Sequence, residues 1–294
     1  LDYIVCLHME PDHAGSMMKA METFPTAKVV GNAKTFTYMA QFFDVNLEGR
    51  KVEVKDGESL SLGEHNLTFV CAPMVHWPEV MVAYESSEKV LFAADAFGKF
   101  GAISKYDGDW ACEARRYYFN ICGKYGVQVQ SLLKKAAALD IKTIAPLHGP
   151  VLKENLGYYL DLYNTWSSYG VESEGVLVAF ASIHGNTRKA AEKIASILEK
   201  QGAKKVVVSD LSRDDEAEVI EDAFRYGRMI IAAPTYDGGL FPPMESFLSH
   251  LKSKNYQKRT VGIIENGTWA PMSGKLMKAA LESMKEIKIC DTVV

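Results

Sequence analysis

Seven side chains of the kinds that bind hard or borderline metal ions follow four apolar stretches of this sequence. The stretches are Tyr3–Leu7, Leu67–Pro73, Val90–Ala94 and Thr143–Leu147. The candidate ligands after them are His8, Glu10, Asp12, His13, His76, Asp95 and His148. Short apolar runs of this type are typical of buried strands, and strand ends can deliver ligands to one point. The pattern therefore predicts a metal centre.

The number of candidate ligands favours two metal ions. A single tetrahedral ion needs only four donors. Asp95 is one carboxylate available to two triplets, so we expect it to bridge the ions. The expected triplets are His8, Glu10 and His76 for one ion, and Asp12, His13 and His148 for the other. Imidazoles and carboxylates without a thiolate suit non-haem iron, manganese or zinc. Two adjacent ions can jointly bind and polarise a small substrate.

We expect the residues between His8 and His13 to form a loop rather than a helix, because a helix would scatter positions 8, 10, 12 and 13 around its circumference.

A second group of loops predicts a binding site for a flat phosphorylated ligand. Ser182–Thr187 follows a predicted strand and opens a predicted helix, where free amides and hydroxyls can hold a phosphate. The segment lacks the G-x-G-x-x-G pattern, so a monophosphate fits better than a dinucleotide. Glycines and aromatic residues after two further strands would surround the ring. The predicted contacts are Ser182, His184, Gly185, Asn186, Thr187, Pro234, Thr235, Tyr236, Asp237, Gly238, Asn266, Gly267, Thr268 and Trp269.

Composition narrows the class of protein. At 294 residues the chain is long enough for about two domains. The net charge of −4 offers no basic surface for nucleic acid, and no apolar stretch reaches the length of a membrane span. The five cysteines are scattered and never spaced as C-x-x-C, which favours reduced thiols and a cytoplasmic location.

The first half of the chain mixes helices and strands. We predict helices at Ala14–Phe24, Ala33–Phe43 and Val127–Leu139, and a β-rich region from Ser61 to Phe97. Tyr84–Lys89 reads as a hairpin connection. A small, polar stretch at Ser167–Gly175 is a candidate linker. The predicted domains are therefore residues 1–168 and 175–294.

The second half alternates strands with helices. The predicted strands are Val176–Ala181, Val206–Leu211, Met229–Ala233, Thr260–Glu265 and Ile287–Val294. The predicted helices are Thr187–Lys200, Glu216–Tyr226, Pro243–Lys252 and Gly274–Lys285. Apolar strands in such an alternation indicate a doubly wound, five-stranded parallel sheet.

Together these motifs resemble the flavodiiron proteins, or A-type flavoproteins, over essentially the whole chain. The H-x-E-x-D-H pattern at His8–His13 is specific, because the hydrolytic relatives have H-x-H-x-D-H. Further likeness lies at Val75–Glu79, Ala93–Gly98 and Ala145–Pro150. The resemblance implies an α/β protein in which a metallo-β-lactamase-like αββα sandwich precedes a flavodoxin-like domain. It also implies two Fe ions on the seven ligands, and FMN on the loops after the strands.

The family likeness implies an enzyme that reduces dioxygen to water, nitric oxide to nitrous oxide, or both. The implied electron donor is a rubredoxin-like or other small carrier. The implied assembly is a head-to-tail homodimer or a dimer of dimers, in which the flavin of one subunit faces the irons of the other. The chain begins inside the strand before the first ligands and ends after the fifth flavodoxin strand. If this chain is the whole molecule, we expect one face of each domain to lack cover.

Two alternatives remain open from the sequence. One is a zinc-dependent hydrolase of lactamase type fused to a flavodoxin-like module, which Glu10 disfavours. The other is a non-catalytic flavin electron carrier with an incomplete metal site. Metal analysis and gas consumption distinguish them from the oxidoreductase.

Overall fold

The computed structural model describes residues 1–105 and 109–294 and contains two compact units. The first comprises Leu1–Tyr117 with Tyr125–Asn164, and the second comprises Tyr118–Lys124 with Thr165–Val294. None of the described helices has the length and apolarity that a membrane crossing requires. The predicted boundaries at 168 and 175 stay a prediction.

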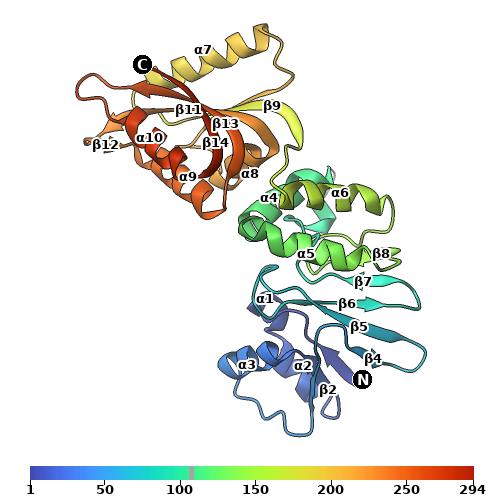
Figure 1. The fold of residues 1–294 in the computed structure, drawn as a ribbon. Helices are drawn as coiled ribbons and strands as arrows, with labels where there is room; N and C mark the ends of the chain where they lie inside the picture. The colour runs from blue at the N-terminus through green and yellow to red at the C-terminus, as the bar shows by residue number, and fades with distance from the viewer. Residues whose placement is uncertain (106–108) are drawn as a thin grey trace. The chain divides into compact units, whose positions relative to one another are not determined.

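Two sheets lie face to face in the first unit (Figure 1). The parallel sheet has the order β1-β2-β3, and the mixed sheet has the order β4-β5-β6-β7-β8. The first sheet consists of β1 (Tyr3–Val5), β2 (Lys28–Gly31) and β3 (Lys51–Glu53). The second consists of β4 (Ser59–Ser61), β5 (Asn66–Cys71), β6 (Met81–Glu85), β7 (Val90–Phe92) and β8 (Thr143–Ala145).

The core of this unit has two apolar layers. Val30, Phe69 and Met81 are buried between the sheets. On the other face of the parallel sheet, Met21 and Met39 pack from α2 (Met17–Thr23) and α3 (Ala33–Phe42). Helices α5 (Gly126–Ala136) and α6 (Leu156–Ser167) lie beside the mixed sheet (Figure 1). This arrangement confirms the predicted αββα sandwich.

Several predicted elements of the first unit need correction. The predicted helix Ala14–Phe24 is instead α1 (Pro11–Ala14) and α2, which are separated at Gly15 and Ser16. A Cβ on Gly15 would lie 2.5 Å from the Pro11 carbonyl oxygen, so the chain turns tightly there. Helices α4 (Trp110–Ile121) and α6 were not predicted, and two short 3₁₀ turns, Ile103–Lys105 and Gly123–Tyr125, were also missed. The hairpin between β6 and β7 is confirmed by the pairing of Glu85 with Val90.

The second unit is a doubly wound sheet of the predicted kind. Its parallel strands have the order β10-β9-β11-β13-β14. They are β9 (Ser173–Phe180), β10 (Val206–Asp210), β11 (Tyr226–Tyr236), β13 (Gln257–Asn266) and β14 (Lys285–Val293). Helix α7 (Asn186–Lys200) covers one face (Figure 1). The other face carries α8 (Glu216–Arg225), α9 (Pro242–Ser253) and α10 (Ser273–Glu282).

Two features of this unit differ from prediction. Strand β9 begins at Ser173, inside the predicted linker. Gly175 is a residue of this strand, and a Cβ there would lie 2.6 Å from the ring of Tyr226, so the glycine allows close packing. The short strand β12 (Gly239–Leu240) pairs antiparallel with β11 through a turn at Asp237 and Gly238, whose φ values are 50° and 70°. That Asp-Gly pair is the usual sequence of a two-residue hairpin turn, so the signal was present.

Candidate metal centre and flavin pocket

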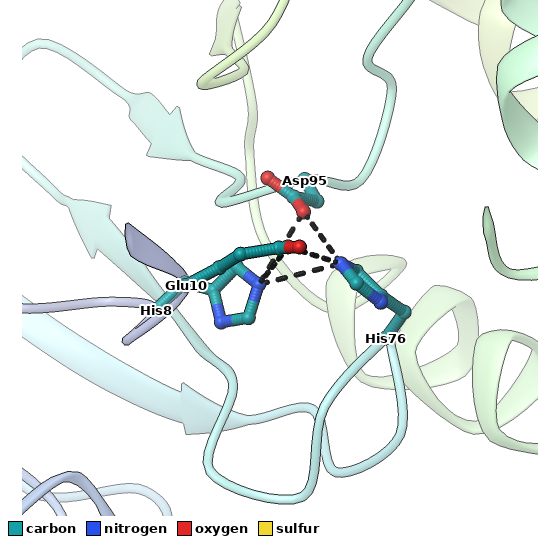
Figure 2. Close-up of side chains that lie close together, drawn as sticks. All are labelled: His8, Glu10, His76 and Asp95. Atoms are coloured by element: carbon teal, nitrogen blue, oxygen red, sulfur yellow. Dashed lines mark hydrogen bonds and ion pairs between the residues drawn. The ribbon is translucent and has the colours of Figure 1, made fainter. Parts of the chain in front are cut away.

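The first group of predicted ligands converges at the end of β1. His8 and Glu10 follow β1, and His76 lies in the loop between β5 and β6. Glu10 Oε2 is 3.2 Å from His8 Nε2 and 2.9 Å from His76 Nε2. Figure 2 shows these side chains and Asp95 pointing toward one another. The ligand atoms of all four residues lie within 4.8 Å of each other, close enough to share one ion. We call the group of His8, Glu10 and His76 position 1.

The second group, position 2, consists of Asp12, His13 and His148, whose donor atoms also lie within 4.8 Å of one another. Asp12 Oδ2 is 3.5 Å from His13 Nε2 and 3.3 Å from His148 Nε2. Asp12 and His13 belong to α1, so the expectation of a loop throughout residues 8–13 is wrong in its second half. The helix begins only at Pro11, and two adjacent helical residues still reach one ion.

Asp95 lies between the two positions. Its Oδ2 is 3.0 Å from His76 Nε2, while its Oδ1 is 3.0 Å from His13 Nε2 and 3.7 Å from His148 Nε2. Each carboxylate oxygen therefore faces a different group, as a bridging ligand requires. Left-handed backbone at Ala94 and Phe97, with φ values of 49° and 65°, makes the turns that surround this residue.

Backbone hydrogen bonds beyond the strand ends bring these loops together. The Leu147 N–H donates to the Ala94 carbonyl at 2.8 Å, which keeps the loop of His148 beside that of Asp95. The Met81 N–H donates to the Leu7 carbonyl at 3.1 Å, which links the start of β6 to the segment before His8.

The centre contains buried polar atoms that lack hydrogen-bond geometry. Both carboxylate oxygens of Asp95 and Nε2 of His13 are of this kind, although they lie at ion-pair distances. Burial opposes ionisation of Asp95, but the neighbouring imidazoles outweigh it and hold the pKa of this carboxyl well below its usual range. Burial lowers the pKa of His13 and His76, but Asp95 and the other neighbouring carboxylates together raise the pKa of both above its usual value. A bound cation would satisfy these buried oxygen and nitrogen atoms.

Glu79 is a buried residue of this centre that the sequence did not indicate. Its Oε1 accepts from His8 Nδ1 at 2.6 Å and from the Met9 N–H at 2.9 Å. Burial opposes its ionisation, but the His8 and Met9 hydrogen bonds lower the pKa of Glu79 below its usual value. Metal-binding histidines commonly donate their second ring N–H to a carboxylate, but no sequence signal pairs Glu79 with His8, which is 71 residues away.

In the second unit, a cavity of about 210 Å³ lies beyond the carboxyl ends of β9, β11 and β13. Twelve of the predicted contacts line it, and Gly185 and Tyr236 do not. Those lining it are Ser182, His184, Asn186, Thr187, Pro234, Thr235, Asp237, Gly238, Asn266, Gly267, Thr268 and Trp269. Ile183 and Ala270, which were not predicted, also contribute.

The cavity has the chemistry of a phosphate and ring site. Helix α7 begins after Gly185, which has a φ of 84°, and no side chain caps the helix. Its first amides are therefore available to an anion. Asn266 Nδ2 donates to Thr187 Oγ1 at 3.1 Å and joins two of the loops. The indole of Trp269 is 78% exposed and Tyr236 is 49% exposed, so large aromatic faces stand open near the cavity.

Comparison with known proteins gives a concordant result. Residues 1–149 match the model of the ODP family beta lactamase, and residues 177–291 match that of a flavodoxin domain. A nitric oxide reductase of Moorella thermoacetica is 30% identical over 97% of this chain and 73% of its own length. A flavodiiron protein of Giardia intestinalis has the same fold, with a TM-score of 0.90 at 22% identity, and covers 100% of this chain and 75% of its own. The chain belongs to the flavodiiron family.

Two further comparisons show how much of a longer protein the chain spans. An uncharacterized protein of Methanocaldococcus jannaschii is 30% identical over 85% of this chain, which spans 64% of that relative. The rubredoxin oxygen:oxidoreductase of Desulfovibrio gigas superposes with a TM-score of 0.89 at 24% identity, covering 100% of this chain and 75% of its own. The chain thus spans 64% to 75% of the lengths of these four proteins.

Flavodiiron membership implies FMN and a di-iron site, and the residues present fit both. Three carboxylates, with Glu79 beside them, balance the charge of two divalent ions. Oxygen and nitrogen donors without thiolate suit iron. The uncapped start of α7 suits a phosphate, and exposed aromatic faces suit an isoalloxazine ring.

Proposed function

We propose that this protein is a flavodiiron oxidoreductase that reduces dioxygen to water, nitric oxide to nitrous oxide, or both. The observation that carries the proposal is the pair of donor groups that share Asp95, with one carboxylate oxygen toward each. Relatives named nitric oxide reductase and rubredoxin oxygen:oxidoreductase support the same reaction class.

Each iron would be bound by a different group of ligands. His8, Glu10 and His76 would hold one iron, and Asp12, His13 and His148 the other, with Asp95 between them. When bound, the irons supply the redox chemistry and bind the diatomic gas. Glu10, Asp12 and Asp95 contribute negative charge that stabilises the higher oxidation state. The indole of Trp77 lies beside two of these ligands, with its ring centroid 5.2 Å from that of His8 and 6.1 Å from that of His76.

Glu10 separates this proposal from zinc hydrolysis. It presents a carboxylate oxygen to both histidines of position 1, where the hydrolytic relatives have a histidine. A harder donor favours iron over zinc. Elemental analysis of protein produced with both metals in the medium tests this: zinc without iron would instead support a hydrolase.

FMN would bind in the pocket of the second domain and deliver electrons to the irons. Ser182, Asn186 and Thr187 would hold the phosphate, and Trp269 and Tyr236 would contact the ring. The proposed donor is a rubredoxin-like or other small electron carrier, since the Desulfovibrio gigas relative is named for a rubredoxin. Normal flavin absorbance with no bound iron and no gas consumption would instead indicate an electron carrier.

We also propose a head-to-tail homodimer in which electrons pass from the flavin of one subunit to the irons of its partner. Activity that depends on protein concentration across the monomer–dimer equilibrium is the expected result. Full activity in a proven monomer would contradict this route. A cytoplasmic location is proposed as well, and the free thiols of Cys6, Cys71 and Cys290 are consistent with it.

Anaerobic single turnover tests the reaction itself. The FMN- and iron-loaded protein is reduced, mixed with dioxygen or with nitric oxide, and followed by flavin absorbance and product analysis. We expect flavin reoxidation with release of water or nitrous oxide. Flavin that stays reduced with both gases, in protein that contains its iron, would contradict the proposal.

A further inference from the structure

The two metal positions are unequally exposed to solvent. At position 1, the His8 side chain is 0% exposed, His76 is 13% exposed and Glu10 is 34% exposed. At position 2, His148 is 34% exposed and Asp12 is 48% exposed, and only His13, at 11%, is well buried. Water therefore competes more effectively for an ion at position 2.

The imidazoles of the two positions are also held differently. Nδ1 of His8 is 2.6 Å from Oε1 of Glu79, which is fully buried. Because an ionised carboxylate can only accept, Nδ1 must carry the proton and Nε2 is left free to bind a metal. Within residues 1–105 and 109–294, Nδ1 of neither His13 nor His148 has a hydrogen-bond partner. Only position 1 has a histidine whose tautomer is set before metal arrives.

Glu79 is itself fixed from two directions. The Met9 N–H donates to its Oε1 at 2.9 Å, next to the ligand His8. The Asn32 side-chain amide donates to its backbone carbonyl at 2.5 Å. Asn32 also caps α3 by accepting from the Lys34 and Thr35 N–H groups at 3.0 and 3.1 Å. The carboxylate that orients His8 is thus held in place by a helix start and by the backbone beside the ligand.

We propose that the two positions fill in a fixed order, with position 1 binding first and more tightly, and that Glu79 is the positioning residue responsible. Position 2 then holds the more exchangeable ion. This inference rests on the proposed function only in requiring that both positions bind metal. Partners of metal-bound histidines typically change metal affinity by about 10- to 100-fold, which sets the expected difference between the positions.

Cobalt titration tests the order without using activity. The metal-free, FMN-loaded full chain is titrated with Co²⁺, and the visible ligand-field bands and the heat of binding are recorded. We expect two separate steps of one equivalent each. Asp12→Asn should remove or weaken the second step and leave the first. Two equivalents that bind in one indistinguishable step would overturn the proposal.

Variants of Glu79 test its role. Glu79→Ala should weaken the first step by about 10- to 100-fold, change the ligand-field bands of the first equivalent and leave the second step within about threefold. Glu79→Gln keeps an oxygen that can accept from His8, so it should restore most of the first-equivalent spectrum. If the alanine variant does not fold, the first cobalt step of Glu79→Gln is compared with that of the wild type instead.

Glu85→Gln is the matched control. Glu85 is a buried carboxylate at the end of β6 that accepts from the backbone N–H groups of Ser87 and Glu88, away from the metal ligands. It should leave both cobalt steps unchanged. If Glu79→Ala and Glu85→Gln lower the melting temperature alike and neither alters cobalt binding, Glu79 is merely structural and the proposal fails. If the wild type binds no cobalt at all, the proposed metal centre fails as well.

Discussion

The two candidate sites differ in how the chain builds them and in how stable each is without its ligand. The metal centre gathers loops spread from His8 to His148 around Asp95, which is 1% exposed. The flavin pocket is made by loops after strands of one sheet, and its Trp269 is 78% exposed. A buried cluster of carboxylates and imidazoles needs cations to balance its charge, whereas water can fill an open polar pocket. Loss of metal should therefore affect a whole domain, and loss of flavin only its loops.

The strongest way to separate the two sites is to change the bridging carboxylate. Asp95→Asn should reduce bound iron by at least about half, because neither position keeps its full set of anionic ligands. FMN content should be unchanged, because the flavin residues belong to the other unit. Iron and flavin are measured on the same purified sample. Asp140→Asn, which alters an exposed carboxylate paired with Lys89 and Lys142, is the control. Iron content equal to that of the control would break the comparison.

Removal of the metals should destabilise the first domain selectively. Binding at about 100 times Kd adds about 2.7 kcal/mol, which for a domain of about 150 residues corresponds to about 5–10 °C in Tm. Calorimetry of chelated and iron-loaded protein should show this loss in one unfolding transition. The other transition, whose Tm depends on FMN, should keep its Tm. Equal shifts in both transitions would mean that the two units do not respond separately.

A smaller effect is expected in the flavin pocket. Trp269→Ala should weaken FMN binding by about 2- to 12-fold, because an aromatic contact contributes about 0.5–1.5 kcal/mol. Fluorescence titration of the metal-loaded protein measures the Kd for FMN. Val208→Ala, at a partly exposed apolar side chain of β10 outside the cavity, is the control. Unchanged affinity in the Trp269 variant would remove the indole from the site.

The smallest effect is expected at a carboxylate of the metal domain that lies at its surface. Burial raises the pKa of Asp56, but its hydrogen bonds to Lys135 and to the Cys71 N–H, with the charge of Lys135, lower this pKa overall. A lowered pKa adds stability above the unfolded-state pKa, and this stability is lost as pH falls through the folded-state pKa. Asp56→Asn should cost about 0.2–1 kcal/mol at neutral pH and make stability less sensitive to acid below about pH 4. Urea unfolding at pH 7 and pH 3 measures both, and a larger loss at pH 3 than at pH 7 would reverse the expected sign.

The sequence predicted most of the second unit because strand and helix periods alternate there without interruption. Helix α6 was missed because its many apolar and aromatic residues, such as Tyr159 and Tyr163, give no clear amphipathic period. Helix α4 does have such a period, and the signal was overlooked. The short helix α1 was also missed, although Pro11 at its first turn is a known start signal. The two residues of β12 are too few to show a period, and only the Asp-Gly pair at the hairpin turn indicated the strand.

The candidate ligands were accessible from sequence because histidines and carboxylates at strand ends are unusual side chains in a predictable place. Glu79 was not, because its role depends on a contact with His8 across 71 residues of sequence. The inequality of the two metal positions was also inaccessible, since it lies in the exposure of Asp12 and His148 and not in their chemical type.

The central claim is that two metal ions share Asp95, and an anomalous difference map of iron-loaded crystals, recorded at the iron edge, tests it most directly. We predict two peaks about 3.5–4 Å apart, one beside each carboxylate oxygen of Asp95. A single peak, or peaks that do not contact Asp95, would contradict it.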